Sequence, residues 1–139
     1  MRHTLIALAL GLTACAAPDP DGFDVDPRLA DDFAAAAREW CDAGARCAYQ
    51  APDGPSTLRL VKDVHILHGA AGECLARPDG ASQIEIDRDD APETRLNVVA
   101  HELGHHFGCK HSDDPADLMW PYVQALITPP TAHDVACAQ

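Results

Sequence analysis

The sequence predicts an α+β domain with a small twisted mixed sheet, one central helix and a short C-terminal helix. Residues 82–87 alternate between apolar and polar side chains, as a half-buried strand does. Residues 28–42 repeat apolar side chains at helical spacing, and helix-start residues precede a second helix at about 94–107. These patterns share 139 residues, which is enough for one domain with one core.

The other predicted elements are short. Residues 57–68 indicate two brief strands and residues 73–76 a third, after a loop at 50–56 that is rich in proline and glycine. Thr131, followed by Asp134 three positions later, predicts a capped final helix. No convincing strand precedes the first helix, and no repeat or second hydrophobic core is evident.

The N-terminus predicts an export signal. A short basic start precedes an apolar run at 4–12, which is too short to span a bilayer but suits the core of a signal peptide. The run ends in Leu12-Thr13-Ala14-Cys15. This ending resembles the lipobox of bacterial lipoproteins, which are cut before the cysteine and acylated on its thiol. The alternative is an ordinary secretory signal cut near Ala14 or Ala17.

These features give a domain plan. Residues 1–14 are expected to be a lipoprotein signal peptide, residues 15–27 a lipidated tether rich in proline and aspartate, and residues 28–139 the folded domain. We therefore expect a protein of the bacterial cell envelope, anchored outside the cytoplasm at Cys15. The alternative signal predicts a secreted protein.

The net charge of the chain limits the classes of partner that it can bind. The sequence has 10 Lys and Arg against 22 Asp and Glu, a net charge of −12 at pH 7. Such a charge favours solubility and argues against nucleic acid or an anionic membrane surface as a partner. We expect membrane contact only through the lipid anchor, and a monomer.

The cysteines predict disulfides, because an extracytoplasmic chain meets an oxidising environment. If Cys15 carries lipid, two bridges at most can form and one thiol is left over. Cys41 and Cys47 flank the end of the first predicted helix, so a local bridge can form there. A bridge at Cys109 would pin the turn that follows the second helix. The sequence leaves the pairing open among Cys41, Cys47, Cys74, Cys109 and Cys137.

One motif carries the chemistry. A helix advances about 100° per residue, so His101 and His105 lie one turn apart on the same face and can reach a single metal ion. Gly108 can end the helix and turn the chain so that His111 supplies a third ligand. Three protein ligands leave a position open, which is typical of a catalytic zinc site. Glu102 stands beside the first ligand, free to act on water.

From about Gln83 onward the sequence resembles the metzincin clan of zinc metalloproteases, and within it the matrixin branch. The motif from His101 to His111 matches the extended zinc signature of the clan. Met119 follows at the place of the clan's Met-turn, whose methionine lies beneath the metal. The resemblance implies a metzincin-like fold, one catalytic zinc ion, and a pocket lined by Pro121 and Tyr122 for the residue after the scissile bond.

This resemblance, together with the residues, implies a zinc endopeptidase that acts on peptides or proteins. Zinc held by the three histidines would bring the pKa of a water molecule to about 7, and Glu102 would act as general base. A substrate strand is expected to pair with an edge strand that contains Ile84 and Ile86. No matrixin-like structural zinc segment is present, and His65 and His68 are interpreted as ordinary strand residues.

Two other functions remain open at this point. The chain can be a non-catalytic zinc-binding surface lipoprotein that kept the fold, or a zinc hydrolase of a non-protein amide. A calcium ion could also bind, at the acidic turn before the second helix, because calcium is usually bound by carboxylate oxygens. We favour a solvated acidic turn over a calcium site at Asp87, Asp89 and Asp90.

Overall fold

The computed structural model describes residues 19–64, 70–89, 92–122 and 129–139. In chain order, the elements within these ranges are β1 (Gly22–Val25), the 3-10 helix η1 (Pro27–Leu29), α1 (Ala30–Asp42), β2 (Tyr49–Gln50), β3 (Ser56–Val61), β4 (Gly72–Ala76), β5 (Ser82–Asp87), α2 (Pro92–His106) and α3 (Ala132–Cys137). The predicted α+β class is therefore confirmed.

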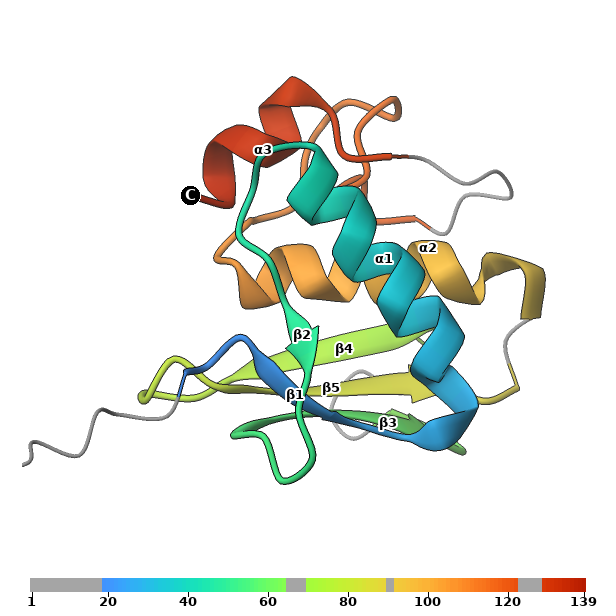
Figure 1. Cartoon of the computed structure of the whole chain (residues 1–139). Coiled ribbons are helices and arrows are strands. Elements are labelled where there is room, and N and C mark those ends of the chain that lie inside the picture. Colours follow the sequence, from blue (N-terminus) through green and yellow to red (C-terminus); the bar gives the residue numbers. More distant parts are fainter. Residues whose placement is uncertain (1–18, 65–69, 90–91, 123–128) are drawn as a thin grey trace, which may run out of the picture.

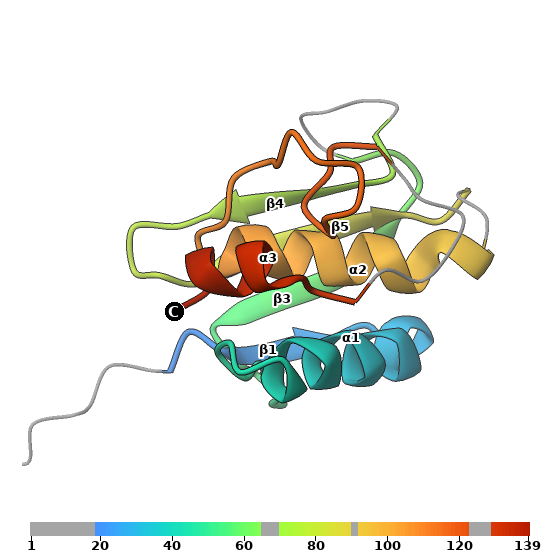
Figure 2. The ribbon, with the colours of Figure 1, turned by 90° about the horizontal axis from the view of Figure 1, so that it is seen from above.

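The strands form one sheet in the order β2-β1-β3-β5-β4, in which β4 is antiparallel to β5 and the other pairs are parallel. Figure 1 shows α1 and α2 on the same face of this sheet, with α3 on the far side of α2. In Figure 2, seen from above, α1 and α2 lie side by side across the strands. The sheet thus supports α2 from below while α1 flanks it.

The core lies between the sheet and the two long helices. Phe23 and Ile84 from the sheet and Trp40 and Leu103 from the helices are all fully buried. The indole Nε1 of Trp40 donates a hydrogen bond of 2.8 Å to the carbonyl oxygen of Ala100 on α2. A buried indole thereby keeps its hydrogen-bond partner, and α1 is fixed against α2.

Most elements expected from the sequence are confirmed. The first helix follows η1, the strands β3, β4 and β5 lie within or next to the segments predicted as strands, and α2 carries the histidine motif. α3 begins with the expected capping box, in which the side chain of Thr131 caps the backbone of Asp134 and the reverse. The second strand expected within 57–68, with His65 and His68, falls largely on 65–69, outside the described residues.

The prediction that residues 15–27 form a tether outside the fold is wrong for residues 22–25. Residues 22–25 form β1, which lies in the interior of the sheet, and Phe23 is fully buried. Phe23 pairs with Gln50 on one side and with Ser56 on the other. The strand was missed because four residues set among aspartates and prolines are too few to show alternation. Its stability comes from parallel pairing with segments that are distant in sequence.

The prediction that the strand with Ile84 and Ile86 lies at an edge of the sheet is also wrong. β5 lies between β3 and β4, so that Ile84 pairs with Leu58 on one side and with Cys74 on the other. The edge strands of the sheet are β2 and β4, and β4 is the one beside β5. Alternation identifies a strand but carries no information about its neighbours, and the sheet order therefore had to come from the structure.

Two disulfides are present, Cys41–Cys47 and Cys109–Cys137. The local bridge at the end of α1 and the bridge at Cys109 are thus confirmed. Cys74 on β4 forms no disulfide within the described residues. Cys15 and the predicted signal peptide lie outside those residues. In the part of the chain that the structure describes, no helix combines the length and apolar character needed to cross a membrane.

Candidate metal centre

Three histidines converge at the outer face of α2. His101 and His105 lie one turn apart on this helix, and His111 returns from the loop that follows it. One ring nitrogen from each of the three lies within 4.8 Å of the other two. The Nε2 atoms of His105 and His111 are 3.2 Å apart. Such spacing matches nitrogen ligands that surround a single ion.

The rings of the two helical histidines are oriented by backbone carbonyls. Nδ1 of His101 donates to the carbonyl oxygen of Leu118 at 2.9 Å, and Nδ1 of His105 donates to that of Cys109 at 2.8 Å. A carbonyl oxygen can only accept, so the proton of each ring is on Nδ1 and the lone pair of Nε2 faces the cluster. Orienting partners of this kind are typical of histidines that bind metals.

The charge state of these rings also suits a metal. Burial lowers the pKa of His101 to about 4, and burial also lowers the pKa of His105. Both rings are therefore neutral at pH 7, which is the form that binds zinc. Three imidazole nitrogens are a donor set that zinc prefers, and the three histidines fit this ion.

The turn after α2 places the third histidine. α2 ends at His106, and Gly108 follows with a φ of +98°, a left-handed conformation that favours glycine. The N–H of Gly108 donates to the carbonyl of His105, and that of Cys109 donates to the carbonyl of Gly104. The predicted role of Gly108 is confirmed: it ends the helix and returns the chain toward the cluster.

Glu102 lies beside the histidines and is 6% exposed. Its position on α2 turns its side chain toward β4, where Gly72 is a near neighbour. Burial raises the pKa of the Glu102 carboxyl to about 8, and the negative charge of Glu73 adds to this rise. A carboxyl whose pKa is raised by its surroundings accepts protons more readily near neutral pH.

Met119 packs against α2 at Gly104. It is 1% exposed, and its side chain lies against Gly104, together with Trp40 of α1. The carbonyl of Met119 accepts a hydrogen bond of 2.9 Å from the N–H of Ser112, one residue after His111. The Met119 segment therefore contacts both ends of the histidine motif.

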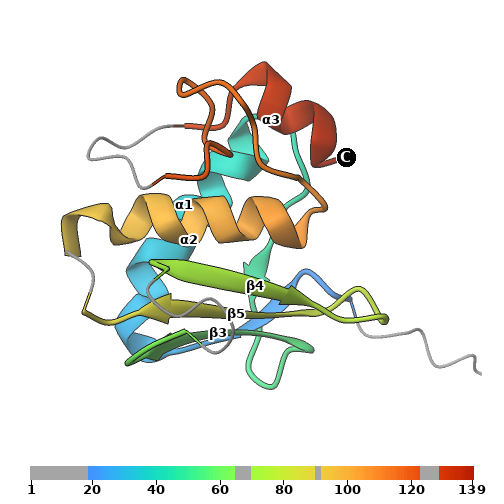
Figure 3. The same cartoon turned by 180° about the vertical axis from the view of Figure 1, so that it is seen from behind.

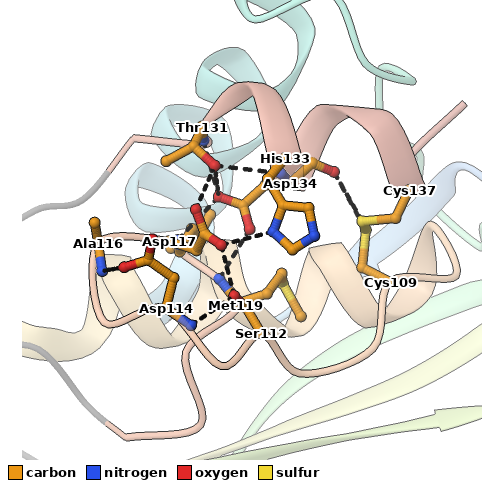
Figure 4. A network of polar contacts seen from close by, with 11 residues as sticks. Cys109, Ser112, Asp114, Ala116, Asp117, Met119, Thr131, His133, Asp134 and Cys137 are labelled. Carbon is orange, nitrogen blue, oxygen red and sulfur yellow. Dashed lines mark hydrogen bonds and ion pairs between the residues drawn. A yellow bond between two sulfur atoms is a disulfide. The ribbon is translucent and has the colours of Figure 1, made fainter.

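A buried polar network holds this segment to α3 (Figure 4). The carboxylate of Asp134 accepts hydrogen bonds from the N–H groups of Leu118, at 2.9 Å, and Met119, at 3.2 Å. A second carboxylate, that of Asp117, accepts from the side chains of Ser112, Thr131 and His133. This supporting role could not be predicted from the sequence, in which the only signal is the capping box at the start of α3.

Comparison with known protein families shows which family this chain belongs to. The matrixin profile (peptidase M10) matches residues 49–136, more than half of the chain. The chain belongs to the matrixin family. A comparison with curated proteins finds no match. The matrixin region includes the three histidines, Glu102 and the Met119 segment, while β1 and α1 lie before it. Matrixins are zinc metalloproteases, which agrees with the donor set of the cluster.

The residues expected to line a pocket in the matrixin domain follow the Met119 segment. Pro121 and Tyr122 are both exposed, and Tyr122 is 69% exposed. The ring of Tyr122 lies 5.5 Å from that of Trp120. Tyr122 is therefore available to a ligand at the surface, and no contact of the described residues assigns it to a pocket.

The acidic turn of the matrixin domain shows no cation site among the described residues. Asp87 accepts a hydrogen bond of 2.9 Å from the N–H of Asp89, and Asp89 also lies 3.5 Å from Arg88. Each of these two carboxylates thus has a local donor. Asp90 lies outside the described residues.

Proposed function

We propose that this matrixin domain is a zinc-dependent endopeptidase in which Glu102 is the general base. The observation that supports this most strongly is the place of Glu102. Its buried carboxyl lies one residue from His101, on the side of the helix that meets the edge strand. A protein that only binds zinc has no need for a buried carboxyl at this place.

The chemistry divides between the ion and the chain. Zinc, held by His101, His105 and His111, would act as a Lewis acid that polarises a substrate carbonyl and favours ionisation of water. Glu102 takes a proton from the water molecule that attacks this carbonyl, and then delivers it to the leaving amine. The positive charge of a cation at the histidines favours the ionised form of Glu102 and so opposes the effect of burial on its pKa.

The substrate is proposed to bind along β4 rather than β5. β4 pairs with β5 on one side only, and in Figure 3 it lies at the front edge of the sheet, next to α2. An extended peptide can add to an exposed strand edge through main-chain hydrogen bonds. Binding there would carry the scissile bond past Glu102 and the histidines. Any peptide of suitable shape gains these hydrogen bonds, which supports peptide or protein substrates.

Two finer features belong to the same proposal. Met119 is proposed to be the methionine of a Met-turn, which its burial against Gly104 supports. Pro121 and Tyr122 are proposed to line the pocket for the residue after the scissile bond, which the exposure of Tyr122 permits. We propose no calcium ion for activity.

The protein is further proposed to act at the bacterial cell envelope, as a monomer anchored by lipid at Cys15. The lipobox-like Leu12-Thr13-Ala14-Cys15 supports this. The full chain should appear in the membrane fraction of an expressing bacterium, and Cys15→Ala should move it to the soluble extracytoplasmic fraction. Unchanged fractionation would argue against the anchor.

The activity is tested by incubating the purified domain with a mixed peptide library, with and without a zinc chelator. We expect cleavage that the chelator abolishes and that Glu102→Ala reduces by more than about a hundredfold, while zinc remains bound at one ion per chain. Glu93→Ala, an exposed glutamate on the same helix, is the matched control and should keep the wild-type pattern.

The outcome also separates the alternatives. Zinc at one ion per chain with no cleavage of any peptide would favour a zinc-binding lipoprotein or an amidase of non-protein substrates. Equal cleavage by the wild type and Glu102→Ala would disprove the assigned role of Glu102. Absence of zinc after purification in zinc-replete buffer would disprove the metal centre.

A further inference from the structure

Gly72 is an unexpected residue for the edge strand. It begins β4, and its φ does not lie in the left-handed region, so the backbone there can accept any residue. Glycine in a strand loses more conformational freedom on folding than alanine and adds no packing. A glycine inside a strand therefore often marks a place where another group approaches the backbone closely.

The approaching groups come from α2. A Cβ atom built on Gly72 would lie 2.8 Å from Cγ1 of Val98, 3.1 Å from Cγ of Glu102 and 3.1 Å from Oε1 of Glu102. The first distance is too short for any carbon pair, and the other two are shorter than ordinary contacts. The Glu102 carboxyl thus rests against the bare backbone of β4.

Another glycine in the same sheet shows the difference. A Cβ on Gly22, in β1, would meet the ring end of Tyr49 at 3.2 and 3.3 Å, and that exposed side chain can move away. Val98 is 5% exposed and Glu102 is 6% exposed, and both stand on a helix packed on the sheet. They have little room to yield.

We propose that Gly72 is a positioning residue for Glu102, because its missing side chain leaves the space in which the carboxyl of the general base is held between α2 and the edge strand. This inference rests on the proposed function in one respect, the role of Glu102 in catalysis. The steric part, that Gly72 and Glu102 compete for one space, does not depend on any activity.

A side chain at residue 72 would affect catalysis through the direction in which it displaces Glu102. A methyl group on residue 72 would press on Cγ and Oε1 of Glu102 and move the carboxyl away from β4. The ligand nitrogens of His101 and His105 would keep their positions, because their rings are held by the carbonyls of Leu118 and Cys109. Proton transfer would suffer while the metal centre and the main-chain edge stay in place.

The kinetic test uses Gly72→Ala with the peptide substrate cleaved best by the wild type. We expect kcat to fall by about tenfold or more, since displacement of a reacting group by a fraction of an ångström to 1 Å can be this costly. KM and the zinc affinity, measured by chelator competition, should change less than about threefold. Gly22→Ala is the matched control and should leave kcat unchanged.

A second variant separates positioning from packing. Val98→Ala removes the nearest of the three contacts and leaves both contacts to Glu102. The drop in thermal midpoint caused by Gly72→Ala should be smaller in the Val98→Ala background than in the wild type, because only the contacts to Glu102 are left, yet kcat should remain low. Recovery of kcat in this double variant would show that Gly72 only makes room for Val98, and would overturn the proposal.

A thermodynamic cycle tests the steric part without catalysis. The drop in thermal midpoint caused by Gly72→Ala should be smaller in the Glu102→Ala background than in the wild type, because the competing side chain is gone. If Gly72→Ala fails to fold alone but folds with Glu102→Ala, the proposal is also supported. An equal drop in both backgrounds, or an unchanged kcat in Gly72→Ala, would overturn it. An inactive wild type would disprove the proposed function, but not the shared space.

Discussion

The carbonyl oxygen of Leu118 lies 2.9 Å from Nδ1 of His101. Because this oxygen can only accept, it fixes both the tautomer and the direction of the ring, and Nε2 is left to face the other two histidines. The carbonyl of Cys109 does the same for His105. The quality of the metal centre thus depends on two backbone groups that carry no signature in the sequence.

Both of these carbonyls are held by α3. Asp134 on this helix accepts from the N–H of Leu118, and Cys137 at its end forms the disulfide with Cys109. Figure 4 shows Asp134 in the first turn of this helix and Cys137 at its end, bonded to Cys109. The C-terminal helix therefore supports the metal site although none of its residues reaches the three ligand nitrogens.

The first prediction concerns Asp134. Asp134→Ala leaves the buried N–H groups of Leu118 and Met119 without their acceptor, which should lower the free energy of unfolding by about 1–3 kcal/mol. Because the Leu118 carbonyl is then less well placed, zinc affinity should fall by about tenfold. Chelator competition and thermal unfolding measure the two effects. Asp134→Asn keeps an acceptor and should be milder; a loss of stability with unchanged zinc affinity would contradict the support role.

The second prediction concerns the disulfide at Cys109. Replacing Cys109 and Cys137 by serine should lower the free energy of unfolding by about 2–4 kcal/mol and also weaken zinc binding, since Cys109 carries the carbonyl that orients His105. Serine at Cys41 and Cys47 is the control, because that bridge closes a short loop away from the histidines. The control should lower stability and leave zinc affinity as it was. Equal losses of affinity in both variants would refute a specific effect.

The parts of the site that the sequence could reveal are those set by local geometry. The spacing of His101 and His105 fixes their common face through the helical repeat, and Gly108 marks the turn through its backbone freedom. The final helix could be predicted for the same reason, because the capping box needs only Thr131 and Asp134. In each case the interacting groups lie within a few residues of one another.

The errors arose where pairing partners are distant in sequence. β1 forms because Phe23 is buried between residues that follow 27 and 33 positions later, Gln50 and Ser56. The alternation of β5 predicts a strand but does not give its neighbours, and β5 lies inside the sheet, next to the edge strand β4. Sheet order and contacts such as that of Gly72 with α2 depend on the assembled fold.

The third prediction concerns the packing of Met119 against α2. A Cβ on Gly104 would overlap Sδ of Met119 and lie 2.9 Å from the Trp40 ring, in a fully packed core. Gly104→Ala should therefore lower the free energy of unfolding by about 1–3 kcal/mol. Chemical denaturation measures this effect. The loss caused by Gly104→Ala should be smaller in the Met119→Ala background than in the wild type, because the overlapping side chain is gone. An equal loss in both backgrounds would show that the contact with Met119 does not cause it.

The last prediction is a pH dependence set by Asp117. Hydrogen bonds from Ser112, Thr131 and His133 hold the pKa of its carboxyl at about 2, below the ordinary 3.8, so its stabilising effect is full above pH 3.8 and is lost as the pH falls toward 2. The same contact raises the pKa of His133 above 6.5. The stability from the charged His133 is present below pH 6.5 and is lost as the pH rises through the raised pKa.

The stability difference between wild type and Asp117→Asn should therefore be largest between about pH 4 and 6.5, and should shrink on both sides of this window. Thermal unfolding from pH 2 to 8 in the presence of a chelator measures it without a contribution from zinc release. The upper decline should be shallow, because the His133 side chain is 73% exposed, and it should disappear in His133→Ala. A difference that is constant across this range would show that Asp117 acts only through its shape and not through its charge.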